Sequence, residues 1–218
     1  MTSPSFFEFL ATSWDHILEL AIGHAIVVAI SLAIAVVIGV SLGVLVYRRE
    51  RAANVLLAIT STFLTIPSLA LFGIFIPIFG LGYTPAVVAL VMYALLPILR
   101  NTVTGLRSVD PAIAESAQGM GMSARERLFR IELPLAWPVI IAGVRVSTML
   151  LMGIAAIAAV VNGPGLGEDI FAGLARIGGA NALNLVLGGT LGIIVLALLF
   201  DTFFNLLGKL TTSRGIRD

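Results

Sequence analysis

Apolar residues in this chain run together over stretches that are too long for the core of a soluble domain. Five stretches stand out, at residues 22–46, 55–79, 85–99, 135–161 and 183–207. The hydrocarbon core of a bilayer is about 30 Å thick and needs about 20 apolar helical residues. The pattern therefore predicts an all-α polytopic membrane protein with five crossings, of which the third is short.

Composition supports the membrane prediction and excludes several other classes. The 218 residues are 59% hydrophobic and 11% charged, against about 25% charged in soluble domains. A net charge of +1 gives no basic field for nucleic acid. With no Cys and two His, neither a thiolate site nor an HExxH zinc site is expected. Lys209, which lies in no phosphate-binding loop, is the one lysine, so we expect no enzyme, no bound cofactor and no ATP site in this chain.

Basic residues indicate how the chain crosses the membrane. All of the 13 Lys and Arg except Arg145 and Arg176 follow the first, third or fifth apolar stretch. Cytoplasmic loops are enriched in Lys and Arg. We therefore expect an outer N-terminal segment at 1–21, a transmembrane domain at 22–208 and a cytoplasmic tail at 209–218.

Hydroxyl residues are concentrated in the second apolar stretch. Ser61, Thr65 and Ser68 fall at i, i+4 and i+7, which is one face of a helix, and Pro67 interrupts the stretch. A polar, kinked face is what a translocation path through the membrane needs. An equally good interpretation is that these hydroxyls donate to the backbone carbonyls that the proline leaves without a partner. The sequence does not decide between the two interpretations.

Small residues and two charges mark the other spans. Residues 35, 39 and 43 are Ala, Gly and Gly, and residues 188 and 192 are both Gly, spacings that let helices pack backbone to backbone.

Arg145 and Asp201 lie within spans, where a charge is costly. We expect the arginine side chain to snorkel toward the membrane surface or to pair with another group within the bundle. Two isolated charges do not make a proton relay.

The polar segment at about 108–133, between the third and fourth spans, carries helix punctuation. Asp110 is a good N-cap, and Pro111 suits the first helical position. The helix should break at Gly119 or Gly121. A second helix should begin at a capping box, Ser123-Ala124-Arg125-Glu126, and end near Leu133, because Pro134 disfavours helix at the residue before it. Two short helices at an angle are suited to docking a soluble protein, whereas a plain solvated loop needs no caps.

The same segment resembles the EAA motif of the permease subunits of ABC importers. The matching residues, with every spacing correct and a serine at the second position, are Glu115, Ser116, Ala117, Gly121, Ile131, Leu133 and Pro134. The resemblance implies that the segment forms coupling helices that sit in a cleft of a separate ATPase. By the same resemblance, Glu115 and Gly121 belong to that interface.

A narrower resemblance covers roughly residues 20–208. Stretches such as 66–73 (IPSLALFG), 93–102 (YALLPILRNT) and 163–167 (GPGLG) are similar to those of osmoprotectant importers. This implies the five-helix fold of type I ABC importers in a bacterial cytoplasmic membrane, importing glycine betaine, choline or carnitine. The implied partners are an ATPase dimer that binds ATP, a second permease copy or a paralogue, and an external solute-binding protein.

Other classes explain less of the sequence. An ABC permease for another small solute, such as an amino acid, is the nearest alternative. A secondary transporter usually shows internal repeats or several intramembrane carboxylates, and no duplicated half is evident here. An intramembrane enzyme needs a catalytic constellation, yet both His lie near the N-terminus. A purely structural subunit leaves the EAA spacing unexplained.

Overall fold

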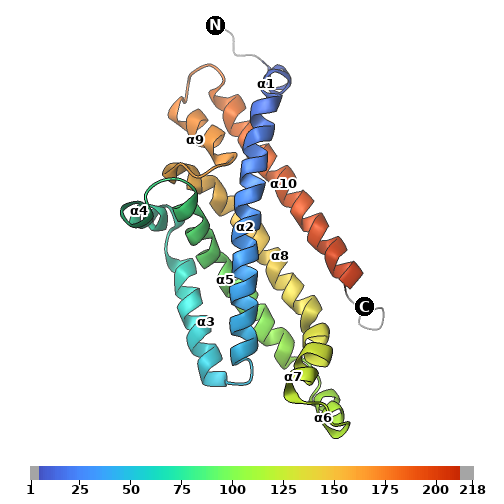
Figure 1. The fold of residues 1–218 in the computed structure, drawn as a ribbon. Helices are drawn as coiled ribbons and strands as arrows, with labels where there is room; N and C mark the ends of the chain where they lie inside the picture. Colours follow the sequence, from blue (N-terminus) through green and yellow to red (C-terminus); the bar gives the residue numbers. More distant parts are fainter. Residues whose placement is uncertain (1–4, 212–218) are drawn as a thin grey trace.

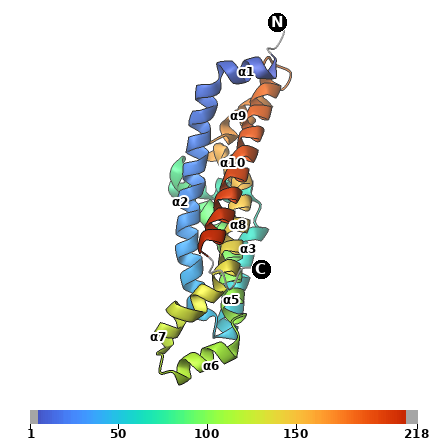
Figure 2. The same cartoon turned by 90° about the vertical axis from the view of Figure 1, so that its right-hand side faces the viewer.

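The computed structural model describes residues 5–211 as an elongated bundle of helices (Figure 1). Its long helices are α2 (Trp14–Val46), α5 (Tyr83–Arg107), α8 (Leu133–Ile157) and α10 (Ala182–Thr211). A short helix, α1 (Phe6–Thr12), precedes them at the end of the bundle where the N-terminus lies. Two further short helices, α6 (Pro111–Gly119) and α7 (Ala124–Arg127), extend beyond the opposite end (Figure 2).

Four of the five predicted spans are single helices long and apolar enough to cross a membrane. Helix α2 begins at Trp14, ahead of the predicted start at residue 22, and has 33 residues. At 1.5 Å per residue it is about 50 Å long, so its ends extend beyond a core of about 30 Å.

The second predicted span is not one helix. It is a pair, α3 (Glu50–Thr65) and α4 (Ser68–Phe79), which meet at 96°. Pro67 lies in the break, where its missing N–H and its ring interrupt the helical hydrogen bonds. The angle is held from another helix, because the Tyr93 hydroxyl of α5 donates to the Ile66 carbonyl at 2.7 Å.

Helix α5 occupies the centre of the bundle, packed between α2 and α8. Residues of all three helices are fully buried against one another, among them Val27, Leu90 and Leu151. The small residues predicted on the first span make the close approach: a Cβ added at Gly43 would lie 2.5 Å from Cγ2 of Thr102. The spacing of small residues thus identified the contact face between α2 and α5.

The end of the bundle near α1 is closed by a glycine-rich connection and a short helix. The connection follows a 3-10 turn, η2 (Ala158–Val161), and leads into α9 (Gly167–Ala175), which packs against α10 (Figure 1). Here too glycine permits contact, since a Cβ at Gly189 of α10 would lie 2.7 Å from the Leu166 carbonyl oxygen.

Candidate functional site: the segment between α5 and α8

The first helix of the segment begins and ends as its sequence predicts. The Asp110 side chain caps α6 by accepting the Ala112 N–H at 2.8 Å, and Pro111 is the first helical residue. Gly121 has φ of +85°, in the left-handed region that favours glycine. Behind it, the Met122 N–H donates to the Ala117 carbonyl at 3.1 Å and closes the end of the helix.

The predicted capping box at the start of α7 is also present. The Glu126 N–H donates to the Ser123 hydroxyl, and the Glu126 carboxylate accepts from the Ser123 N–H at 2.9 Å. The backbone N–H and the hydroxyl of Ser123 lower the pKa of Glu126, because both donate to its ionised form.

The predicted end of the second helix near Leu133 is wrong. Helix α7 continues through a π turn, η1 (Leu128–Glu132), directly into α8. In that turn the Leu133 N–H donates to the Leu128 carbonyl, five residues back. The wider turn accommodates Pro134 near the start of α8, so the segment and the fourth span form one continuous element.

The residues of the EAA pattern differ in exposure. Glu115, Ser116, Gly121 and Pro134 are exposed, Ile131 and Leu133 are half-buried, and Ala117 is 1% exposed. The structure thus brings a glutamate, a serine and a left-handed glycine to the surface of one protruding element, whereas the alanine of the pattern is the buried residue of α6.

Three large apolar side chains are exposed on the same element. They are Ile113 (43% exposed), Met120 (75%) and Phe129 (58%). Leu128 and Ile131, spaced i, i+3, are both half-buried, and Leu128 packs against a buried cluster around Leu106. Sequence reasoning missed Met120 because it lies just past the end of α6, outside any helical periodicity.

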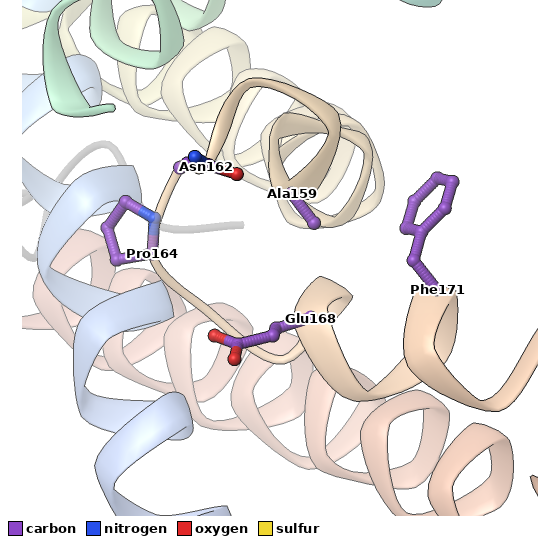
Figure 3. Close-up of a pocket in the computed structure, with 6 residues that line it drawn as sticks. Ala159, Asn162, Pro164, Glu168 and Phe171 are labelled. Atoms are coloured by element: carbon purple, nitrogen blue, oxygen red, sulfur yellow. The ribbon is translucent and has the colours of Figure 1, made fainter. Parts of the chain in front are cut away.

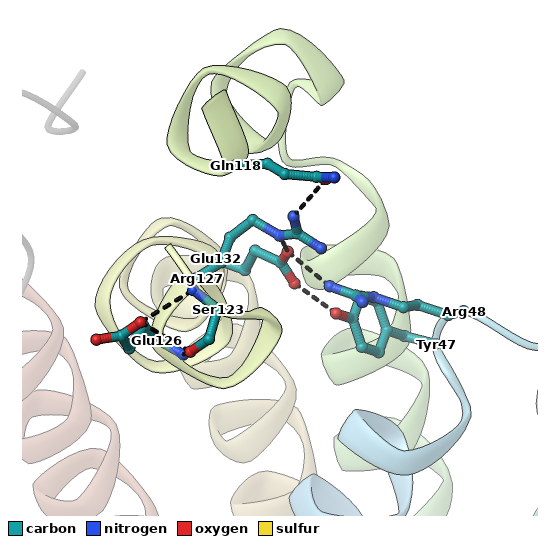
Figure 4. Close-up of polar contacts among 7 residues, drawn as sticks. All are labelled: Tyr47, Arg48, Gln118, Ser123, Glu126, Arg127 and Glu132. Atoms are coloured by element: carbon teal, nitrogen blue, oxygen red, sulfur yellow. Dashed lines mark hydrogen bonds and ion pairs between the residues drawn. The ribbon is translucent and has the colours of Figure 1, made fainter. Parts of the chain in front are cut away.

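Beneath this surface lies a buried carboxylate that sequence reasoning did not single out. Glu132 is 4% exposed and accepts from Arg48 at 2.8 Å and from Arg127 at 3.1 Å (Figure 4). The Tyr47 hydroxyl donates to its second oxygen. We call Glu132, Tyr47, Arg48 and Arg127 the Glu132 cluster. The available signal was a glutamate in an apolar Ile-Glu-Leu-Pro run at the membrane boundary, where a charge needs a partner.

The Glu132 cluster reaches two further elements. Arg127 donates to the Gln118 side chain of α6 at 2.9 Å, and Arg107 at the end of α5 donates to the Tyr47 carbonyl at 2.8 Å. Burial and the hydrogen bond to Glu132 raise the pKa of Tyr47 to about 12, so its hydroxyl stays protonated and continues to donate at neutral pH.

The hydroxyls of the predicted translocation path do not share one helical face. Ser61 and Thr65 lie on α3, whereas Ser68 begins α4 beyond the 96° bend. Ser61 donates to the Ala58 carbonyl at 2.8 Å, and Thr65 to the Thr62 carbonyl at 2.7 Å. Both acceptors lie upstream in α3, and the Ile66 carbonyl at the break accepts its hydrogen bond from the Tyr93 hydroxyl instead.

The two intramembrane charges form a pair. Arg145 of α8 donates to Asp201 of α10 at 2.7 and 3.1 Å, and both side chains are 36% exposed. Pairing within the bundle was one of the two expectations for Arg145, and it explains how the two charges are accommodated within the bundle.

At the opposite end of the molecule, the glycine-rich connection borders a cavity of about 350 Å³. Asn162, Pro164, Glu168 and Phe171 line it together with Ala159 and Gly163 (Figure 3). Close by, His16 of α2 bonds Asp169 of α9 at 2.9 Å. Among residues 5–211 no group of three or more His, Cys, Asp or Glu is placed to hold a metal ion.

The arrangement of the helices matches solved permeases of ABC importers. One match is a chain of the inward-facing MetNI methionine ABC transporter in its native crystal form. It has a TM-score of 0.73 at 22% identity, over 93% of this chain and 96% of that one. A chain of an amino acid ABC transporter crystallised with histidines gives a TM-score of 0.75 at 18% identity, over 96% and 99% of the two chains. The fold is that of a type I ABC importer permease, as predicted.

Residues 35–213 match the family described as binding-protein-dependent transport system inner membrane component, and the chain belongs to that family. It is therefore a multi-pass membrane component of an ABC transporter, a class of subunit that is not itself catalytic. The choline transport system permease protein OpuBB of Bacillus subtilis is 38% identical over 96% of this chain and 95% of its own length. The osmoprotectant import permease protein OsmW of Salmonella typhimurium is 39% identical, with 92% and 89% covered. The predicted resemblance to osmoprotectant permeases is confirmed.

Proposed function

We propose that this chain is the permease subunit of an ATP-driven importer for compatible solutes, in particular quaternary amines such as choline, glycine betaine and carnitine. The names of relatives that match nearly the whole chain support this substrate class, including the carnitine transport permease OpuCD of Listeria monocytogenes, which is 36% identical. A bacterial cytoplasmic membrane, with the Arg-rich end of the bundle inside, is the location we propose.

The observation that carries the coupling role is the surface of the segment outside the bundle. Ile113, Met120 and Phe129 expose apolar side chains on a polar, well-capped element that projects beyond the predicted membrane region. The fold leaves these side chains exposed, so a protein partner would gain by burying them. An ATPase subunit is the partner that the EAA spacing favours.

In this proposal, two ATPase subunits bind ATP, close, and move the docked α6 and α7. Because α7 continues without interruption into α8, a displacement of the segment tilts a span directly. A second permease copy, or a paralogue, completes the path, and an external binding protein delivers the solute. Ser61, Thr65 and Ser68 near the α3–α4 bend are proposed to contact that path.

Co-purification tests the coupling role. We expect the wild-type chain to hold an ATPase subunit at a fixed stoichiometry in detergent, and Met120→Asp to lose it because a charge then lies in the apolar contact. Val37→Asn, at a position 67% exposed on α2 within the membrane region, is the matched control and should retain the ATPase. An ATPase that stays bound to Met120→Asp at the wild-type level would refute the assigned docking surface.

A further inference from the structure

The covalent chain joins the coupling segment to only two of the membrane helices. Residues 108–110 connect α5 to α6, and η1 connects α7 to α8. The corner between α2 and α3, at residues 47–49, is far away in sequence. Side chains span this separation: Tyr47 and Arg48 of the corner both bond Glu132, which lies at the end of η1.

We infer that Glu132 is a positioning residue that carries the movement of the coupling helices to the corner between α2 and α3. The inference rests on the proposed function, because it assumes that an ATPase moves the segment. It extends that function by naming the residue through which a third and a fourth helix take part in the motion.

The geometry makes this link stiff. Glu132 is 4% exposed, so water does not compete for its oxygens, and bonds to a charged acceptor are stronger than neutral ones. Its donors come from the corner, Tyr47 and Arg48, and from the segment, Arg127. Arg127 also holds Gln118 of α6, so both coupling helices are tied to the same carboxylate (Figure 4).

The link ends at α3, which packs against α5 through the buried Ala53 and has a break at its far end. Helix α3 starts directly after the corner and ends at the break before Ser68, where it meets α4 at 96°. A helix with a break at one end and the Glu132 cluster at the other behaves as a lever, because broken helices are where rigid elements change their relative angle. Movement of Glu132 therefore reaches the bend near Ser61 and Thr65.

A distance measurement separates this role from that of a simple structural brace. The chain has no Cys, so cysteines introduced at Asn54 of α3 and Ala124 of α7, both exposed, can carry spin labels. The labelled permease, diluted with unlabelled chains and purified with its ATPase, is measured without nucleotide and with ATP trapped. We expect the distance to stay constant, because α3 follows the segment.

In Glu132→Gln the same measurement should show ATP changing the label distance by about 2 Å or more, since the charge that holds the corner is gone. Arg48→Ala removes one donor that is half exposed and should give the same change in a chain that folds. Glu50→Gln, an exposed glutamate at the start of α3, is the matched control and should behave as wild type.

The amount of choline imported per ATP hydrolysed is the second readout. A residue that only braces the fold lowers the yield of complex and leaves this ratio unchanged, whereas a positioning residue lowers the ratio. Label distances and transport ratios that match wild type in both Glu132→Gln and Arg48→Ala would overturn the inference. A wild-type chain that holds no ATPase would instead overturn the proposed function.

Discussion

Each end of the molecule holds one buried carboxylate on which separate helices converge, and the two are held very differently. Glu132, at the end that we propose is cytoplasmic, is 4% exposed and accepts from Tyr47, Arg48 and Arg127. Asp169, at the outer end, is 3% exposed and is bonded by His16 through one oxygen. Within residues 5–211, its other oxygen, Oδ2, is buried and has no hydrogen-bond partner.

The difference in hydrogen bonding indicates at which end the helices are held together more strongly. A buried charge is stable only when its lone pairs are satisfied, and Glu132 meets that condition with donors from two distant parts of the chain. Asp169 is held by one protein donor on a half-exposed histidine, so we expect that separating α9 from α2 costs less than separating the corner from the segment at the other end. This asymmetry fits the proposed function, in which an ATPase pushes from inside and the path opens outside.

The largest effect is expected where the inner end meets its partner. Gly121→Val places a branched side chain at φ of +85°, and Glu115→Lys reverses an exposed charge, so each should abolish solute uptake while the chain still inserts. Gly119→Ala, where an added Cβ meets open space, is the control and should transport normally. Radiolabelled choline uptake in cells gives the result, and uptake that survives both changes would contradict the coupling assignment.

The next effect concerns the Glu132 cluster itself. Glu132→Ala removes the shared acceptor and leaves Arg127, whose side chain is 13% exposed, without its charge partner. Breaking a buried ion pair in this way costs about 3 to 5 kcal/mol. The thermal midpoint of the purified chain in detergent should therefore fall clearly, and a midpoint equal to that of wild type would show that the cluster adds no stability.

The smallest effect is expected at the outer end. Asp169→Ala removes one bond to a half-exposed His16 and also removes the unpartnered Oδ2, so the loss should be about 1 kcal/mol or less. Measured beside Glu132→Ala, it sharpens the comparison of the two ends. A loss at Asp169 as large as that at Glu132 would remove the asymmetry on which this comparison rests.

Local signals in the sequence predicted the coupling segment well. Asp110, the capping box at Ser123 and the left-handed Gly121 act through bonds to residues within five positions, so a single stretch of sequence contains the whole interaction. The five apolar runs and the small residues of the first span could also be recognised in the sequence. The thickness of the bilayer sets the length of an apolar run, and close helix packing requires small side chains.

Long-range contacts account for what the sequence did not reveal. The kink at Pro67 was predicted, but the contact that holds its 96° angle comes from Tyr93, which reaches Ile66 from another helix. The Glu132 cluster joins residues 84 and 85 positions apart. The helix end predicted near Leu133 rested on the rule that proline disfavours helix at the residue before it. The π turn before Pro134 lets the helix continue, and that rule does not include such a turn.

Reconstitution into proteoliposomes tests the central claim most directly. The purified chain is incorporated alone or together with its ATPase and external binding protein, and the concentration of labelled choline inside is followed with ATP supplied on the ATPase side. We predict accumulation above the outside concentration only when all three proteins and ATP are present. Uphill accumulation by the chain alone would contradict the claim that another protein's ATP hydrolysis drives it.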